Sequence, residues 1–288
     1  MLTSDMISLL WCPTCSQSHL RAEIKNRAGD AILEGLLICE KCRTSYLVQE
    51  GVPMLLPESR LDSDEWNLWK QHLDRFNERR QHRLKASIRI SRTRKQKPHQ
   101  AFFEFVGITE GNVLDVGCGP GKLRAYLNEK RVTYYGMDPL PTPDVQDFRF
   151  VSALAEHIPF RDSTFSNILV ISALDHFNNV DHFFKEAFRV LKRNGRFHLF
   201  QTVHEVRSAG SLAKEFAHHA KDAFDNFKTR KSSAAPKHMT EFKQSELLAI
   251  AQGYFEIDSL KVYGRDWYTP DKLFISMKPI SKQMISES

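Results

Sequence analysis

The sequence predicts an α/β protein built on a doubly wound, largely parallel β-sheet and preceded by a small β module that holds a metal ion. Three observations lead to this prediction. Strand-like apolar runs alternate with helical patterns over residues 112–200, a glycine-rich turn follows the first of these runs, and two Cys-x-x-Cys pairs lie within the first 42 residues. A chain of 288 residues is long enough for one α/β domain and a small extra module.

Composition places the chain among globular proteins, since 41% of the residues are hydrophobic and 26% are charged. No stretch approaches the roughly 20 apolar residues of a transmembrane helix, and the first 11 residues lack the basic run of a signal peptide. Four of the five cysteines form two close pairs. We therefore expect a cytoplasmic protein with reduced thiols rather than a disulfide scaffold. The sequence leaves the oligomeric state open.

Charge divides the chain into three parts. The net charge is +6, and residues 61–100 alone hold 11 basic and 5 acidic residues. The expected organisation is a metal-binding module over residues 1–60, a basic helical connector over residues 61–100 and a main domain over residues 101–288. The connector is expected to be helical because four apolar residues repeat at helical spacing after Ser63: Trp66, Trp69, Leu73 and Phe76.

The connector carries nine lysines and arginines between Arg79 and Lys97 without an intervening acid. Such a run is able to bind phosphate-rich material such as RNA, a nucleotide-sugar or an anionic lipid. It is equally typical of a solvated helix face or linker. Aromatic residues are absent from Arg79 to Gln100, so the groups that stack on single-stranded RNA bases are missing there.

The two cysteine pairs have the spacing C-x2-C-x23-C-x2-C. Four thiolates in this arrangement complete a tetrahedral zinc site without an open ligand position, so the metal is expected to be structural rather than catalytic. The alternative is two vestigial or redox-active pairs that bind nothing. Between them, Leu20–Lys25 and Ile32–Ile38 read as strands of a hairpin around Ala28–Asp30. The expected ligands are Cys12, Cys15, Cys39 and Cys42.

Residues 8–58 resemble the small zinc-ribbon proteins that act as activator subunits of tRNA and protein methyltransferases. The resemblance rests on Leu9-Leu10 before the first cysteine pair and on the closing run Gly-Val-Pro-Met-Leu-Leu at residues 51–56. It implies a module that braces a methyltransferase domain in the same chain.

The most informative stretch of the main domain is the apolar run that ends at Val116 and enters a turn of three glycines: Gly117, Gly119 and Gly121. Such a turn lets the backbone approach a ligand, and the helix expected at Lys122–Leu127 aims its N–H groups at it. Dinucleotide-binding enzymes use similar turns, so the pattern alone is weak. Cys118, within the turn, is interpreted as a small packing residue because no basic partner is evident.

The spacing G-x-G-x-G, with Asp115 two residues ahead, resembles motif I of class I methyltransferases that use S-adenosylmethionine (SAM). The resemblance implies that this loop holds the amino-acid part of SAM. A second strand, Thr133–Met137, ends at Asp138, 21 residues past Gly117. A carboxylate in that position can accept both ribose hydroxyls.

Further matches follow in order. Residues 155–160 are close to the family's Ala-Glu-x-Leu-Pro-Phe, and residues 192–195 resemble its turn before the fifth strand. The resemblance implies the Rossmann-like doubly wound sheet of class I methyltransferases, with Leu154, Ala155 and Ser172 beside the cofactor. Leu154 replaces the usual aspartate, so backbone groups or apolar packing would hold the adenine. The expected elements are strands 148–151, 165–171 and 196–200 and a helix over 180–191.

The last part of the chain reads as a variable region. We expect a helical stripe over residues 212–227, a loop over 228–237, a helix over 244–252 and closing strands over 255–262 and 273–277.

SAM carries an activated methyl group, so the protein mainly has to place the acceptor in line with it and exclude water. A base is required only when the acceptor loses a proton. His176 is the first candidate, followed by His238 and Asp175, and each has the alternative of a packing or turn residue. The predicted function is SAM-dependent methyl transfer to a small-molecule, glycan or lipid-linked acceptor. The alternatives are an RNA base methyltransferase and a non-catalytic methyltransferase-like scaffold that binds partners.

Overall fold

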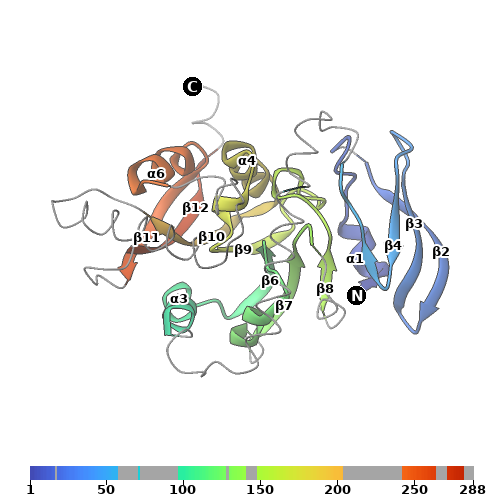
Figure 1. Cartoon of the computed structure of the whole chain (residues 1–288), viewed down its shortest axis with the longest axis horizontal. Helices are drawn as coiled ribbons and strands as arrows, with labels where there is room; N and C mark the ends of the chain where they lie inside the picture. Colours follow the sequence, from blue (N-terminus) through green and yellow to red (C-terminus); the bar gives the residue numbers. More distant parts are fainter. Residues whose placement is uncertain are drawn as a thin grey trace, which may run out of the picture.

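The computed structural model describes residues 1–16, 18–57, 71, 97–127, 130–140, 148–203, 242–263 and 271–281. Most of the expected connector, the expected stripe over 212–227, the expected loop over 228–237 and His238 lie outside the described residues. In the described part, the chain forms an antiparallel sheet near the N-terminus and a larger mixed sheet, which lie next to each other (Figure 1). The predicted fold class is confirmed.

The N-terminal module is a five-stranded antiparallel sheet with one short helix. The predicted hairpin is present, and its turn contains Gly29 in the left-handed conformation (φ 58°). Along β4 the burial alternates, so that Tyr46 and Val48 face the core and Leu47 faces outward. The module consists of β1 (Leu2–Thr3), α1 (Ser4–Leu9), β2 (Leu20–Ala28), β3 (Ala31–Cys39), β4 (Ser45–Gln49) and β5 (Val52–Pro53).

The main sheet has seven strands in the order β11-β12-β10-β9-β6-β7-β8. The five strands from β10 to β8 are parallel to one another, and β12 is antiparallel to both of its neighbours. The central strands are apolar on both faces, as expected for a parallel sheet covered on both sides. The strands are β6 (Glu110–Val116), β7 (Arg131–Met137), β8 (Arg149–Val151), β9 (Phe165–Ile171), β10 (Leu191–Val203), β11 (Phe255–Tyr263) and β12 (Asp271–Pro279).

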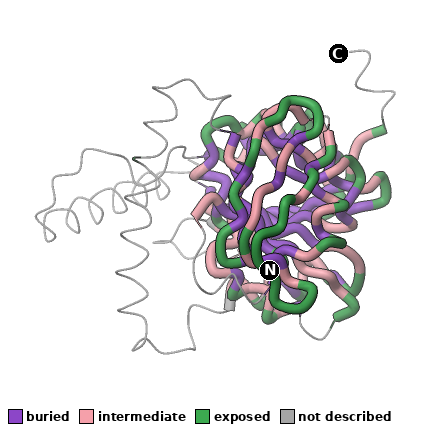
Figure 2. The backbone as a smooth tube through the Cα atoms, turned by 90° about the vertical axis from the view of Figure 1, so that its right-hand side faces the viewer, coloured by how far each residue is buried: buried purple, intermediate pink, exposed green. Residues whose placement is uncertain are grey.

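Helices cover both faces of this sheet. On one face, α4 (Val180–Val190) and α6 (Gln244–Gln252) pack in the same apolar cluster as Phe197 and Met277. On the other face, α3 (Lys97–Val106) packs Phe102 against Phe200 and Phe274. Figure 1 shows this layering, and Figure 2 shows buried residues running through the centre of the body.

Two elements differ from their predicted form. Lys122–Leu127 is a 3-10 helix (η3) rather than an α-helix. The residues predicted as a turn, 192–195, belong to β10, because Leu191 already pairs with Phe165 before the register shifts and pairing resumes at Arg196. This register shift, a bulge or other irregularity of β10, lies directly after α4 ends at Val190.

The module contacts the main sheet just past the end of its edge strand β8, where Met54 and Ser152 form an isolated parallel bridge. Ser152, directly after β8, donates its N–H to the Pro53 carbonyl (3.0 Å) and accepts the N–H of Leu55 at its own carbonyl (2.7 Å). A second contact joins the module to residues 159–161. There the Trp11 N–H donates to the Pro159 carbonyl (3.1 Å) and the Arg161 N–H donates to the Leu9 carbonyl (3.0 Å). Apolar residues of both parts share one core cluster.

Arg189, near the end of α4, fastens the segment that follows β8. Its guanidinium makes five hydrogen bonds of 2.7–2.9 Å: to the carbonyls of Ile158 and Phe160, to Asp162, and twice to Glu186. Glu186 in turn accepts the N–H of Ile158 (3.1 Å). The guanidinium carbon also lies 6.0 Å from the centre of the Trp11 ring. One side chain therefore connects α4, the segment 158–162 and the module.

We expect Arg189→Met to lower the free energy of unfolding by about 3 kcal/mol, because Glu186 then remains buried without its counter-charge. The control is the double variant Arg189→Met with Glu186→Gln, which removes the uncompensated charge and should recover part of the loss. Equilibrium denaturation of the three proteins measures both effects. A single variant as stable as the natural chain would contradict the fastening role of Arg189.

Candidate functional site

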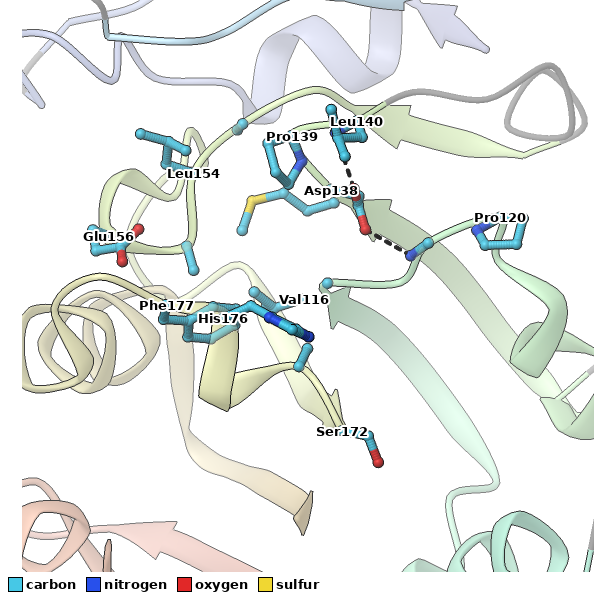
Figure 3. A pocket seen from close by; sticks show the side chains of 16 residues that line it. Val116, Pro120, Asp138, Pro139, Leu140, Leu154, Glu156, Ser172, His176 and Phe177 are labelled. Carbon is cyan, nitrogen blue, oxygen red and sulfur yellow. Dashed lines mark hydrogen bonds between the residues drawn. The ribbon is translucent and has the colours of Figure 1, made fainter. Parts of the chain in front are cut away.

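A cavity of about 260 Å³ opens at the carboxyl ends of β6, β7 and β9. In the sheet, β7 and β8 follow on one side of β6, and β9 and β10 follow on its other side. The direction in which strands are added therefore reverses between β6 and β9. Ligands of doubly wound sheets bind at such a switch point. The cavity wall comes from four segments that follow strands: 116–120, 137–140, 153–156 and 172–177 (Figure 3).

The glycine turn forms one side of the cavity. Gly117 has φ 73°, and a Cβ placed there would lie 2.5 Å from the Cβ of Ala173. Gly121 has φ 64°, and its Cβ would lie 2.4 Å from the Phe148 ring. The N–H groups of Gly117 and Cys118 both donate to the Met137 carbonyl, at 2.8 and 3.1 Å. The turn therefore needs glycine for both conformation and space, and it presents bare backbone to the cavity.

Asp138 lies where β7 ends, beside the glycine turn. Its Oδ2 accepts the N–H of Gly119 and its Oδ1 accepts the N–H of Leu140, both at 2.9 Å (Figure 3). These bonds fix the orientation of the carboxylate at the cavity wall. Each carboxylate oxygen has a second lone pair, so the group retains acceptor capacity for two hydroxyls of a ligand.

Three of the predicted cofactor residues are not among the residues that line the cavity: Asp115, Cys118 and Gly121. Asp115 is fully buried, and the Tyr134 hydroxyl donates to its Oδ2 at 2.6 Å. Burial, opposed by the Tyr134 hydrogen bond and assisted by the nearby Asp138 carboxylate, raises the pKa of Asp115 to about 7. Asp115 therefore lies near the end of β6, behind the residues that line the cavity.

The other predicted cofactor residues line the cavity: Gly117, Gly119, Asp138, Leu154, Ala155 and Ser172. Ser172 directly follows β9 in a left-handed conformation (φ 52°), and its N–H donates to the Phe200 carbonyl (2.7 Å). The candidate base His176 also lines the cavity, from the short 3-10 helix η6 (Leu174–His176). Asp175 is buried and does not line it.

Glu156, which the sequence argument did not single out, lines the cavity opposite Asp138. Its Oε1 accepts the N–H groups of Asn178 (2.6 Å) and Asn179 (3.1 Å). Asn179 caps α4 by accepting the N–H of His182 (2.9 Å). Burial raises the pKa of Glu156, which these backbone donors oppose. The carboxylate ties segment 153–156 to the loop that carries His176. The remaining lining residues missed from sequence are mainly apolar: Val116, Pro120, Met137, Pro139, Leu140, Ala153, Ala173 and Phe177.

The four predicted metal ligands form a second cluster, in the module. Their sulfur atoms all lie within 4.8 Å of one another, with Cys12–Cys42 and Cys15–Cys39 both at 3.6 Å. Each pair closes a turn in which a backbone N–H four residues after the first cysteine donates to that cysteine's carbonyl. The Tyr46 hydroxyl lies 3.2 Å from the Cys12 sulfur. Burial raises the pKa of Cys12, and a bound cation would favour its thiolate form. The donor set fits tetrahedral zinc.

The fold and the cavity define the Rossmann-like class I methyltransferases, the class that uses SAM. Residues 114–199 match the family described as "Methyltransferase domain". Among the described residues, no helix is long and apolar enough to cross a membrane.

Curated relatives resemble this chain over part of its length. The ubiquinone/menaquinone biosynthesis C-methyltransferase UbiE of Bartonella tribocorum is 33% identical over 38% of this chain and 34% of its own length. The uncharacterized methyltransferase YcgJ of Bacillus subtilis is 30% identical over 43% of this chain and 52% of its own. The sterol 24-C-methyltransferase erg6 of Schizosaccharomyces pombe is 31% identical over 36% and 32%. The chain thus spans a third to a half of these relatives.

Solved structures share the fold. The 1,6-didemethyltoxoflavin-N1-methyltransferase of Burkholderia thailandensis aligns with a TM-score of 0.53 at 14% identity, covering 91% of this chain and all of that one. The PH0226 protein of Pyrococcus horikoshii aligns with a TM-score of 0.50 at 18% identity, covering 66% of this chain and 93% of that one. At these identities the likeness is one of fold.

We expect metal-replete protein to contain about one zinc per chain and Cys39→Ser to lose it, because three thiolates leave the tetrahedral site incomplete. Cys118→Ser, which alters the cysteine outside the cluster, should retain the metal. Elemental analysis of the three purified proteins decides the matter. Natural protein without zinc, or a fully loaded Cys39→Ser variant, would exclude this metal centre.

The buried Asp115 should make stability depend on pH. Its folded-state pKa of about 7 lies above its ordinary value of 3.8, so the folded state keeps its proton longer than the unfolded chain. The natural chain should therefore lose stability relative to Asp115→Asn as pH rises from 4 to 7, by on the order of 4 kcal/mol. Urea denaturation of both proteins across this range measures the difference. A difference that does not change with pH would show that Asp115 titrates normally.

Proposed function

We propose that the protein transfers a methyl group from SAM to a small-molecule, glycan or lipid-linked acceptor. The observation that carries the proposal is the placement of Asp138 beside the glycine turn, at the switch point of a methyltransferase-type sheet. The solved methyltransferase of Burkholderia thailandensis is described with bound S-adenosylhomocysteine. Its fold extends over most of this chain, which supports a cofactor of the same kind here.

The residues present fit SAM by the chemistry of the cavity wall. Asp138 would accept the ribose hydroxyls, and the turn from Gly117 to Gly119 leaves room for the charged amino-acid part against bare backbone. The apolar wall that includes Leu140 and Leu154 would hold the base. SAM supplies an already activated methyl group, so this chain's residues orient the two reactants and exclude water.

His176 is the proposed base for an acceptor that has to lose a proton. It lines the cavity at the carboxyl end of β9, where an acceptor would meet the cofactor. Asp175 is the weaker candidate because it does not line the cavity. For an acceptor atom that already offers a lone pair, the same residues would serve only to position it.

The acceptor class is inferred from the relatives. Their names point to ubiquinone or menaquinone precursors, to a sterol and to didemethyltoxoflavin, which are all small molecules. The apolar character of most lining residues supports an acceptor of this kind. The RNA alternative rests on the basic run of the connector, nearly all of which lies outside the described residues.

We further infer the organisation in which residues 1–60 brace the domain of residues 101–288 across the connector of residues 61–100. The hydrogen bonds between Ser152 and the module support this arrangement, since Ser152 directly precedes the cavity wall. The four thiols of the zinc cluster have to stay reduced, which favours the cytoplasm.

Asp138→Ala should weaken the binding of S-adenosylhomocysteine by about 2–4 kcal/mol, because two hydrogen bonds to a carboxylate are lost. Asp258→Ala, on the exposed edge strand β11, is the matched control and should bind normally. Titration calorimetry compares the three proteins. Equal affinities would show that the ribose is held elsewhere, and natural chain that binds neither SAM nor its product would refute the proposed function.

A further inference from the structure

We propose that the described residues of the cavity hold the purine of the cofactor without a side-chain acceptor for its exocyclic amino group, so that the protein accepts nucleoside thioethers with or without that group. This inference rests on the proposed function. It concerns the end of the cavity formed by segment 153–156, where Leu154 and Glu156 lie across from Pro120 of the glycine turn (Figure 3).

The two carboxylates among the described lining residues are oriented by backbone donors, Asp138 through both of its oxygens and Glu156 through Oε1. Asp138 accepts the N–H groups of Gly119 and Leu140, which holds it at the turn side of the cavity. Glu156 accepts the N–H groups of Asn178 and Asn179, at the start of α4. A carboxylate that turned toward a purine amino group would leave buried N–H donors unpaired, which costs more than the new bond returns.

The other polar side chains among the described lining residues are Ser172 and His176. Both belong to the segment after β9, and Figure 3 shows them on the other side of the cavity from Leu154. Leu154 itself is 3% exposed and has no polar atom beyond its backbone. The base would therefore contact Leu140, Leu154 and Ala155, which provide apolar surface and backbone groups.

The physical consequence is a lack of discrimination at one position of the purine. A site that hydrogen-bonds a substrate group strongly rejects an analogue without that group, because the site's own polar atom is then left unpaired. An apolar wall contains no such atom, so removing the amino group leaves nothing unpaired in the protein. A carboxylate introduced at residue 154 would restore the rejection.

The experiment compares S-adenosylhomocysteine with its analogue in which hydrogen replaces the 6-amino group, by titration calorimetry on the natural full-length chain. The expected affinities agree within about threefold, whereas an amino group bonded to a carboxylate would give a difference of about 10- to 100-fold. Leu154→Asp should prefer the amino-bearing ligand by at least about tenfold. Leu154→Ile is the matched apolar control and should behave as the natural chain does.

A natural chain that prefers the amino-bearing ligand by about tenfold or more would overturn the inference. If Glu156→Gln then removes that preference, Glu156 is the acceptor. The natural chain decides this question even if the Leu154→Asp variant does not fold. If neither ligand binds to the natural chain, the proposed function itself fails, and the inference fails with it.

Discussion

The structure depends on holding one irregular segment in place. Residues 152–160 include the cavity wall 153–156, yet their regular structure amounts to a single 3-10 turn, Ala155–His157. A segment with so few hydrogen bonds of its own has to be fixed from outside. Ser152 is fixed by two backbone bonds to the N-terminal module, and Ile158 and Phe160 are fixed by Arg189 of α4. Between these anchors, Glu156 binds the start of the same helix.

The module also covers part of the exposed edge of the main sheet. β8 is an edge strand of only three residues, and a strand edge exposes unpaired backbone groups. Residues 53–55 cover the end of that edge by pairing with Ser152. The Trp11 ring lies near the guanidinium of Arg189, so the module contacts the second anchor as well. Cysteines of the zinc cluster and residues of the cavity wall belong to the same buried apolar cluster.

The parts of the site that sequence predicts are those governed by local rules. Three features of this kind are the glycines at fixed spacing after a strand, the carboxylate at the end of the next strand and the paired cysteines. Each indicates a binding site through residues that lie close together in the sequence. Apart from the bond between Arg189 and Glu186, Arg189 and Glu156 act through partners 22–31 residues away, so the sequence around each residue gives no such signal. Asp115 lies in the predicted motif, but only the structure shows its bond to Tyr134 on the neighbouring strand. The register shift in β10 likewise reflects pairing across the sheet, which local patterns do not encode.

The contact between the N-terminal module and residues 152–161 has a consequence for biosynthesis. Arg161 bonds to the Ser8 carbonyl across 153 residues, and the interface is completed by residues that follow the module by about a hundred positions. Ribosomes add about 5–20 residues per second, so the module leaves the exit tunnel several seconds before β8 does. During that interval it can bind its ion and complete its own fold, because metal binding supplies folding energy to a small domain. The nascent methyltransferase domain then emerges beside a finished template, which shortens the time that the β8 edge stands exposed to other chains.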